Sequence, residues 1–396
     1  MRIHYSYEII KKILRLQIDK LNISSSNFSP LRIMPFGKIS KLLGGVLIVL
    51  SSCDNIDLKN NLPIVDLSKK VTKSEKDVGS DLIKVEDFFM LEFTDSSMLG
   101  TCYIVEDMDD TIILRDIQNV YNFTSSGAFI NRINHIGDGP QEYLNVSDAV
   151  VYNNTINVFD LHKGKIFTYD MEGNYIQSLL NDSLLSITKN KNGHWITRNK
   201  SLNELNYSIC LYDHKWNFLS EVKKNYTEII ESPYLVINPF MKFNDEIYSY
   251  DNDTIYRFTE TCQMSPFLYI SKANLSIPQE ILYDTKRKKE RMNYIWGEYM
   301  CISSKYLFIC YYYDYKKYYD VFDIDTGDLF FRNIVKDVND TEGFPIEINN
   351  KQIYVWPSYV KNDIFYCIVD ESVSQSLFDF MDAEYNPAII KFTIGD

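Results

Sequence analysis

The residues of this chain best suited to contacting a ligand are aromatic. The chain contains 30 Tyr and 23 Phe in 396 residues, and residues 311–319 read YYYDYKKYY. Alternate side chains of a strand face opposite sides of a sheet, so these rings divide between two faces. Some are expected to pack between sheets, as large apolar groups do, and others could stack on sugar rings. The candidate binding residues of this kind are Tyr311, Tyr313, Trp296 and Trp356.

Motifs for catalysis are absent from the sequence. None of the histidines beyond residue 53 stands at a helical metal-binding spacing from another His, Cys or Glu. There is no G-x-S-x-G elbow, no P-loop and no dinucleotide fingerprint. Residues 323–328 (DIDTGD) look like a calcium loop but lack the twelve-residue spacing and the final Glu. We therefore predict no catalytic residue, metal ion or cofactor, although an active site assembled from distant strands stays open.

One glycine-rich stretch, IGDGPQEY, combines turn-forming residues with polar ones. Gly137 and Gly139 permit unusual backbone conformations, and Pro140 stiffens the chain, which indicates a structural loop. Glu142 and Tyr143 could line a binding site or could cap backbone groups of the loop. We favour the structural role and keep both residues as binding candidates.

A repeated unit must position these residues. Five segments share one pattern, in which an aromatic residue ends an apolar run, polar residues follow, and a second apolar run begins. The leading aromatics are 46, 43, 46 and 64 residues apart, at Phe123, Tyr169, Tyr212, Phe258 and Phe322. A period in the forties with strand–turn–strand content is typical of propeller blades. We predict an all-β fold, a six-bladed β-propeller.

Each blade is expected to hold four short strands joined by tight turns. In the second blade these are residues 147–152, 155–160, 165–170 and 175–179, with Asn153-Asn154 as a turn pair. The longest step of the repeat is explained by one inserted helix over residues 277–293. The residues after Pro278 there are strong helix formers.

The last blade is expected to be closed by the N-terminal part of the body. Only three strands are predicted there, at residues 352–356, 364–369 and 388–394. A spare strand, residues 85–93 (VEDFFMLEF), precedes the first blade. Pairing of this strand with residues 388–394 would complete the blade and remove exposed sheet edges.

Residues 38–53 (KISKLLGGVLIVLSSC) have the order of a secretory signal. A basic start is followed by the apolar run Leu42–Leu50, which is too short to span a bilayer as a stable helix. Leu50-Ser51-Ser52-Cys53 resembles a bacterial lipobox. That resemblance implies cleavage before Cys53 and lipid attachment to its thiol. The alternative is a buried apolar strand with a chance cysteine.

These assignments divide the chain into four parts. Residues 1–33 are interpreted as an artefact upstream of a true translation start at Met34, and residues 34–52 as a lipoprotein signal peptide. Residues 53–80 are polar and aperiodic, as in a flexible tether. Residues 81–396 are the predicted propeller.

Charge narrows the choice of partners. The formal net charge is −13, and removal of residues 1–52, with eight Lys/Arg and two Asp/Glu, leaves −19. An acidic body argues against nucleic acid and against polybasic membrane contact, so attachment should rest on the lipid alone. The densest basic run, residues 286–289, is expected to be a solvated helix face, with docking of an acidic partner as the alternative.

The cysteines beyond Cys53 lack C-x-x-C spacing and are expected to be free.

The IGDGPQEY stretch is similar to the G-x-G-P-x-E-[YF] signature of six-bladed β-propeller lipoproteins of the Bacteroides group. Residues 385–390 (YNPAII) resemble the Asn-Pro and apolar final strand of that family, and the lipobox agrees with it. The resemblance covers about residues 83–396, although Trp216 and Cys262 stand where other repeats have Gly. It implies a lipid-anchored envelope protein, in the outer membrane facing the periplasm or the cell surface, often discussed alongside glycan uptake.

We predict a non-catalytic binding protein for a glycan or an envelope protein. A polysaccharide hydrolase or lyase with its site at the channel mouth is one alternative, and a structural scaffold is another. An enzyme should gather two or three carboxylates, or a His with a carboxylate, near the propeller axis. A binder should place aromatic and neutral polar groups there. The oligomeric state is not predicted.

Overall fold

The computed structural model describes residues 62–69, 83–108, 110–200, 207–223, 240–251, 253–259, 263–282, 284–336, 342–369, 371–378 and 386–395. They belong to one compact unit, residues 62–396. Most of the regular structure in this unit is β-strand, as the sequence predicts. Cys53 and the predicted signal peptide lie outside the described residues.

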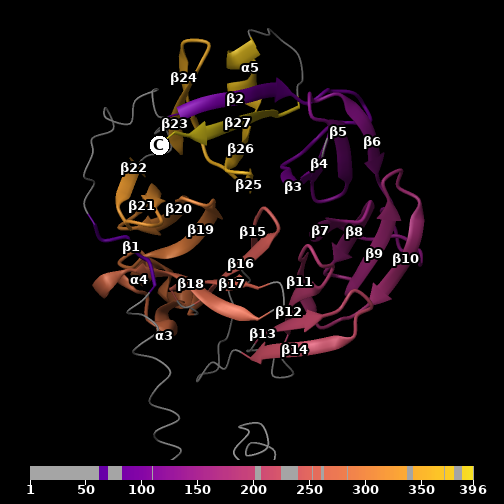
Figure 1. Cartoon of the computed structure of the whole chain (residues 1–396), viewed down its shortest axis with the longest axis horizontal. Coiled ribbons are helices and arrows are strands. Elements are labelled where there is room, and N and C mark those ends of the chain that lie inside the picture. Colours follow the sequence, from indigo (N-terminus) through magenta and orange to yellow (C-terminus); the bar gives the residue numbers. More distant parts are fainter. Residues whose placement is uncertain are drawn as a thin grey trace, which may run out of the picture. The chain divides into compact units, whose positions relative to one another are not determined.

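Four separate sheets have the up-and-down, four-stranded meander of a propeller blade. Figure 1 shows them following one another around a common centre. The predicted turn at Asn153 and Asn154 is confirmed, with φ angles of 48° and 55°. The strands are β3 (Tyr103–Met108), β4 (Thr111–Arg115), β5 (Val120–Thr124) and β6 (Phe129–Ile133); β7 (Asp148–Tyr152), β8 (Thr155–Asp160), β9 (Lys165–Asp170) and β10 (Tyr175–Leu180); β11 (Leu184–Lys189), β12 (Trp195–Lys200), β13 (Tyr207–Tyr212) and β14 (Phe218–Lys223); and β19 (Trp296–Ile302), β20 (Tyr306–Tyr313), β21 (Lys316–Asp323) and β22 (Leu329–Val335).

The predicted number of six blades is wrong. Beside the four separate blades, the strands expected to form two further blades join one nine-stranded sheet. The parallel pair Phe243–Val360, between two short strands, links its two halves. Such a contact between distant segments leaves no periodic signal in the sequence. The order of strands is β1 (Ile64–Asp66), β18 (Met264–Ser271), β17 (Thr254–Phe258), β16 (Glu246–Asp251), β15 (Phe240–Phe243), β25 (Tyr359–Lys361), β26 (Ile364–Val369), β27 (Ala388–Ile394) and β2 (Ile83–Met90).

The predicted pairing of the first long strand with the last is confirmed. β2 runs antiparallel to β27, from the pair Ile83–Ile394 to the pair Met90–Ala388, with a bulge after Val85. β2 begins and ends slightly earlier than the expected residues 85–93. The two ends of the body therefore lie side by side in one sheet, which joins the N-terminal and C-terminal strands (Figure 1).

The strand over residues 352–356 was expected in the sheet of β26 and β27, and this is wrong. β24 (Lys351–Val355) instead pairs with β23 (Phe344–Ile348) in a separate hairpin. The three-residue strand β25 takes the expected place beside β26. A short helix, α5 (Glu371–Phe378), follows β26 and was not predicted.

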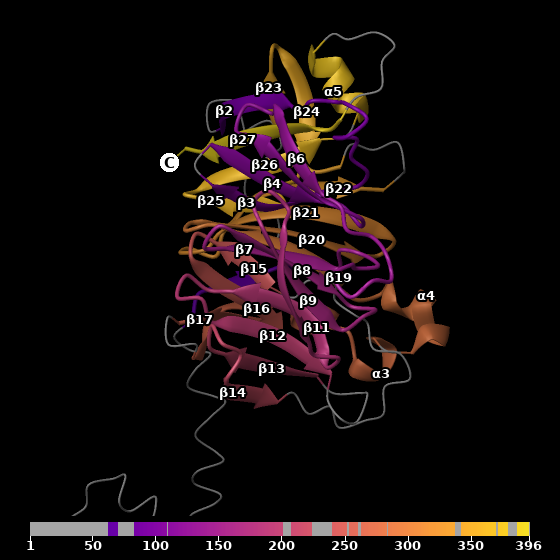
Figure 2. The ribbon, with the colours of Figure 1, turned by 90° about the vertical axis from the view of Figure 1, so that its right-hand side faces the viewer.

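The single helix predicted over residues 277–293 is also wrong. The segment forms α3 (Gln279–Leu282), the 3-10 turn η5 (Thr285–Arg287) and α4 (Lys288–Arg291), preceded by η4 (Ala273–Leu275). Asp284 accepts a hydrogen bond from the Lys286 backbone N–H and so starts a new turn. Arg291, only 2% exposed, donates to the carbonyls of Ile281 and Asp284. These contacts favour broken turns over one helix, and Figure 2 shows α3 and α4 protruding on one side.

No helix in the described part of the chain combines the length and the apolar character needed to cross a membrane.

The five described cysteines beyond residue 100 are free and buried: Cys102, Cys210, Cys301, Cys310 and Cys367. Burial raises the pKa of the Cys301 thiol to about 12, which keeps it protonated and unreactive at neutral pH.

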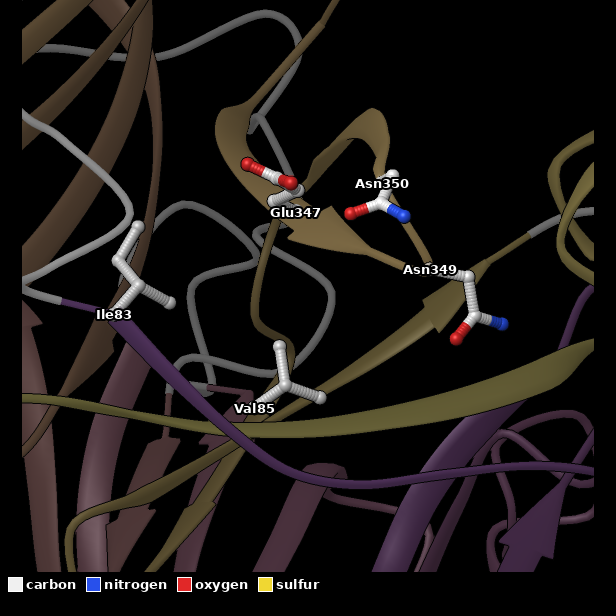
Figure 3. Close-up of a pocket in the computed structure, with 5 residues that line it drawn as sticks. All are labelled: Ile83, Val85, Glu347, Asn349 and Asn350. Carbon is white, nitrogen blue, oxygen red and sulfur yellow. The ribbon is translucent and has the colours of Figure 1, made fainter.

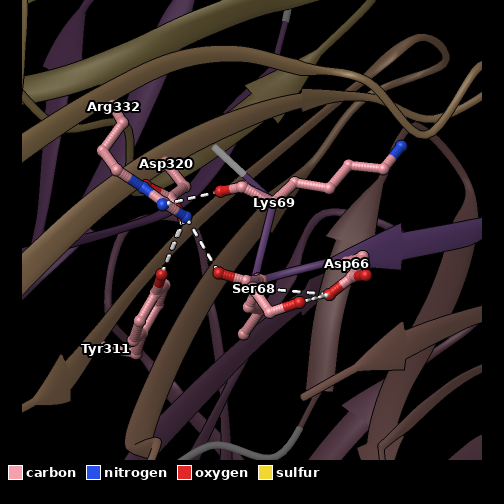
Figure 4. A network of polar contacts seen from close by, with 7 residues as sticks. Asp66, Ser68, Lys69, Tyr311, Asp320 and Arg332 are labelled. Carbon is pink, nitrogen blue, oxygen red and sulfur yellow. Dashed lines mark hydrogen bonds and ion pairs between the residues drawn. The ribbon is translucent and has the colours of Figure 1, made fainter. Parts of the chain in front are cut away.

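Residues 62–69 were assigned to the flexible tether, and the structure places them in the body instead. β1 pairs in parallel with β18. Arg332 on β22 then holds the residues that follow, since it donates to the backbone carbonyls of Leu67 at 3.1 Å and Lys69 at 2.9 Å. Its guanidinium is held in turn by the fully buried carboxylate of Asp320, at 2.6 Å (Figure 4). These charge-assisted hydrogen bonds tie the residues that follow β1 to the sheet β19–β22.

Candidate functional site

The candidate site lies where the inner strands of the sheets meet. Figure 1 shows β3, β7, β11, β15, β19 and β25 nearest the centre. β3 carries two kinds of side chain, Tyr103 at its start and Glu106 with Asp107 near its end, about 10 Å apart along the strand. We call the first group, Tyr103, Tyr299 and Arg115, the aromatic end, and the second group, Glu106, Asp107, Lys242, Tyr359, Tyr366 and Lys391, the charged end.

At the charged end, Glu106 has a partner on each carboxylate oxygen. The residue is 9% exposed. Its Oε2 forms an ion pair with Lys242 on β15, and its Oε1 accepts a hydrogen bond from the Tyr359 hydroxyl at 2.7 Å. The carboxylate therefore connects the sheet of β3 with two inner strands of the nine-stranded sheet.

Asp107 is bound in the same manner on the opposite side of β3. It is 8% exposed, and its Oδ2 accepts a hydrogen bond from the Tyr366 hydroxyl on β26. The Lys391 ammonium on β27 lies 3.6 Å from the same oxygen. Lys361 donates to the Asp107 backbone carbonyl. The two carboxylates together contact β15, β25, β26 and β27, so they fasten the first blade to the large sheet.

The protonation of the two tyrosines supports this role. Burial, followed by the charge of Glu106, raises the pKa of Tyr359 far above its usual value. Burial and the hydrogen bond to Asp107 do the same for Tyr366. Both phenols therefore stay protonated at neutral pH and donate to Glu106 and Asp107. An acid–base pair needs a carboxyl group that can reach a substrate and exchange a proton with it, whereas these two are already engaged.

The aromatic end presents unoccupied ring surface. Tyr103 on β3 is 47% exposed and Tyr299 on β19 is 46% exposed. The Arg115 guanidinium, from the end of β4, lies over the Tyr103 ring at 4.8 Å. Surrounding protein, and to a smaller degree Cys301, Cys310 and Tyr103, raises the pKa of Tyr299. The Tyr299 hydroxyl is thus shielded from solvent by the surrounding protein, including the nearby Tyr103, although the side chain as a whole is about half exposed.

Of the aromatic residues predicted from the sequence, Trp296 comes nearest to this end. It lies on β19 with Tyr299, is half-buried, and stacks on the Tyr312 ring at 5.1 Å. Tyr312 itself is 37% exposed. Trp296 and its neighbour therefore form an aromatic pair beside the inner strand.

The other three predicted aromatics serve packing. Tyr311 is 1% exposed, and its hydroxyl donates to Asp320 at 2.9 Å. Tyr313 is half-buried and packs against the Tyr318 ring at 6.1 Å. Trp356 meets the ring of Phe308 at 5.3 Å and that of Tyr319 at 4.9 Å, edge to face. The structure does not bring these three residues together with Tyr103 and Tyr299 in one exposed group.

The glycine-rich loop is closed on itself. The Glu142 carboxylate accepts a hydrogen bond from the Gly139 N–H at 2.8 Å, and it fills the space that a Cβ on Gly137 would need. Tyr143 is fully buried, donates to the Ile133 carbonyl at 3.0 Å, and has its pKa raised by burial to about 12. Pro140 is exposed between them. These contacts support the structural role that the sequence favours for the loop.

A shallow cavity lies away from the axis, between the edge strand β2 and the hairpin β23–β24. Its volume is about 330 Å³, and Figure 3 shows its lining residues, Ile83, Val85, Glu347, Asn349 and Asn350. The two asparagines have positive φ and form the tight hairpin turn. One carboxylate and two aliphatic side chains offer little for recognition, so we do not place the site here.

The basic run and the histidines contribute no site. Arg287 is paired with Glu290 at 2.5 Å on an exposed surface, as a solvated helical segment would be. Within the described ranges, no three His, Cys, Asp or Glu side chains gather in a way that could hold a metal ion.

Sequence reasoning missed both ends of the axis. Two strand sequences contain features that could have indicated the charged end. The strand YIVEDM has an acidic pair among apolar residues, and the strand FMKF has a lysine. Charged residues of this kind in a strand core need partners. The sequence cannot say which partners they are, because Tyr359 lies more than 250 residues from Glu106.

One known structure shares this fold, and a second matches it less well. A protein described as exported, from Bacteroides fragilis, resembles it with a TM-score of 0.65 and 18% identity, over 85% of this chain and 100% of that chain. A member of the DUF4221 family from Bacteroides vulgatus has a TM-score of 0.42 and 10% identity, over 80% of this chain and 100% of that one. The first likeness supports the propeller-like fold. No curated protein matches the chain.

The expected grouping with six-bladed lipoproteins is not confirmed by these matches. A family model described as a domain of unknown function, DUF4934, matches residues 62–392. The match begins where the compact unit begins, at residue 62, and runs through most of the last strand. The chain therefore belongs to the DUF4934 family.

Proposed function

We propose that this protein is an exported, lipid-anchored binding protein without catalytic activity, which holds a glycan at the aromatic end of its axis. The observation that carries the proposal is the contrast along β3. Glu106 and Asp107 are buried and engaged by Lys and Tyr, whereas Tyr103 and, on β19, Tyr299 remain about half exposed. Flat aromatic surface, with the two carboxylates of the same strand already engaged, suits binding better than hydrolysis.

Export and anchoring rest on the signal-like residues 38–53 and on Cys53. The description of the Bacteroides fragilis structure as an exported protein is in keeping with them. The acidic net charge disfavours nucleic acid as a partner. It favours a ligand that is uncharged or whose charge is bound by individual side chains. In this proposal the lipid on Cys53 provides membrane attachment, and the body faces the periplasm or the cell surface.

Binding of the full-length protein, purified in detergent, to an array of neutral and acidic glycans tests the function. Every glycan that binds is also assayed for release of new reducing ends. Binding without release supports the proposal. Release would show a hydrolase or lyase, and failure to bind any glycan would leave an envelope protein or a scaffold role.

Anchoring is tested separately in cells. Wild-type protein should partition into the detergent phase and incorporate a radiolabelled fatty acid, whereas Cys53→Ser should do neither. Unchanged labelling of the Cys53→Ser variant would overturn the lipid anchor and leave the glycan site unaffected.

A further inference from the structure

We infer that the ligand at the aromatic end carries a carboxylate, as a uronic acid does, and that Arg115 recognises it. This inference rests on the proposed function and deepens it. It starts from a positive charge that forms no ion pair with any residue in the described part of the chain, on a protein that is otherwise acidic.

Arg115 has unused hydrogen-bonding capacity. It is half-buried at the end of β4, and its Nη1 donates weakly to the Val146 carbonyl at 3.4 Å. Among the residues that the structure describes, it forms no other hydrogen bond and no ion pair. A guanidinium carries five N–H donors in a fixed fork, so Nε and Nη2 remain available.

The nearest acid group does not satisfy this charge. Asp148 is buried, and its carboxylate accepts hydrogen bonds from the backbone N–H of Ala149 at 2.9 Å and from Ser186 Oγ at 3.3 Å. Burial raises the pKa of Asp148, and the charge of Arg115 is the largest influence that opposes this shift, although the two groups form no ion pair. Asp148 thus directs its hydrogen bonds to its own backbone and to β11, and Arg115 interacts with it through charge alone, without an ion pair to any described carboxylate.

The geometry around Arg115 suits a planar anion. The Arg115 guanidinium lies over the Tyr103 ring, 4.8 Å from its centre, which restricts where the side chain can go. A fork held in this way binds a carboxylate through two parallel hydrogen bonds. The exposed rings of Tyr103 and Tyr299 offer stacking surface for the sugar ring that carries the carboxylate. A hexuronate presents these two features together, an apolar ring face and an adjacent carboxylate.

The inference is tested by calorimetry of the full-length protein with oligogalacturonate and with its methyl ester, which has the same rings without the charge. The acid should bind at least about tenfold more tightly, as expected for a charge-assisted hydrogen-bonded pair. Arg115→Gln should weaken binding of the acid about 10- to 100-fold and that of the ester less than threefold. Arg115→Lys should recover only part of the loss, because an ammonium lacks the fork.

Arg257→Gln is the matched control. Arg257 also lies over an aromatic ring, that of Phe267 at 5.8 Å, but it is paired with Glu246 at 3.6 Å. This variant should change neither affinity. Equal losses for acid and ester in Arg115→Gln would show a structural role and overturn the inference, and so would equal binding of both ligands by the wild type. Tighter binding of a sulfated glycan than of the uronate would also overturn the inference that the recognised group is a carboxylate. Binding of neutral glycans alone would defeat this inference while leaving the proposed function intact.

Discussion

The two ends of the axis are built on the same strand and differ in how their polar groups are satisfied. Glu106 and Asp107 meet ammonium and phenol groups from four other strands. Tyr103 and Arg115, near the other end of the hairpin β3–β4, leave ring surface and N–H donors unused. The charged end therefore fastens the sheets together. Because the groups of the aromatic end take no part in this joint, they can contact a ligand.

The largest effect is expected from breaking the charged end. Glu106→Gln removes the negative charge and leaves the Lys242 ammonium, whose side chain is 31% exposed, without its counter-ion. The free energy of unfolding should fall by about 3 kcal/mol, as for a mostly buried ion pair that loses one partner. Urea unfolding followed by fluorescence measures it.

Lys84→Gln is the control for this change. Lys84 pairs with Glu86 on the edge strand β2, where its side chain is 74% exposed. An exposed pair contributes less than about 1 kcal/mol. If Glu106→Gln cost no more than Lys84→Gln, the charged end would not be what fastens the sheets.

The second effect concerns the aromatic end and should appear in binding alone. Tyr103→Ala and Tyr299→Ala should each weaken glycan binding about 10- to 100-fold, as loss of a central aromatic contact does. The unfolding free energy should change by less than about 1 kcal/mol, because both rings are about half exposed. Phe218→Ala, at a 59% exposed ring on the outer strand β14, should alter neither property. If Phe218→Ala weakened glycan binding as much as Tyr103→Ala and Tyr299→Ala, the aromatic end would not be the binding site.

The third effect is a pH dependence that belongs to the charged end. The pKa values of Tyr359 and Tyr366 are raised in the folded protein, so the folded state holds these protons more tightly than the unfolded state, whose tyrosines titrate near pH 10. Their contribution to stability is therefore fully present below about pH 10 and is lost as the pH rises above it.

The double variant Tyr359→Phe, Tyr366→Phe should consequently show a shallower loss of stability in urea titrations between about pH 9 and pH 11. It should also lose about 1–3 kcal/mol at pH 7, since two hydrogen bonds to buried carboxylates disappear. A slope as steep as that of the wild type would mean that other buried tyrosines control the alkaline transition.

The smallest effect should come from the glycine-rich loop, which belongs to neither end. Glu142→Ala removes the acceptor of the Gly139 N–H and should cost about 1 kcal/mol of stability with no change in glycan affinity. Glu142→Gln should preserve most of the stability because its amide oxygen can accept the same bond. A loss of affinity in both variants would bring the loop into the binding site after all.

Local patterns were read correctly where a short segment decides its own structure. The strands on either side of Asn153-Asn154 follow the predicted bounds closely, since alternating apolar residues and a turn pair specify a hairpin by themselves. The buried Tyr143 and the hydrogen-bonded Glu142 likewise agree with a loop shaped by its own glycines.

The predictions were wrong where the structure of a segment depends on hydrogen bonds or strand pairing that its local pattern does not reveal. Residues 277–293 have good helix propensity, but the Asp284 side chain starts a new turn and Arg291 caps the carbonyls of the preceding one. The apolar stretch within residues 62–69 is too short to be recognised as a strand, and Ile64–Asp66 pair only because β18 offers an edge, with Arg332 binding the carbonyls of the residues that follow.

The sequence by itself determined an all-β chain with a repeat in the forties and with its first long strand paired to its last, because these features follow from side-chain periodicity and from the count of strands. Only the tertiary structure decided that four blades stand apart while nine strands share one sheet, since that depends on the short parallel pairing of β15 with β25 at Phe243 and Val360. It also decided which charges are satisfied. Glu106 and Arg115 are equally polar in the sequence, but packing brought a lysine and a tyrosine to the first and, among the described residues, no ion pair to the second.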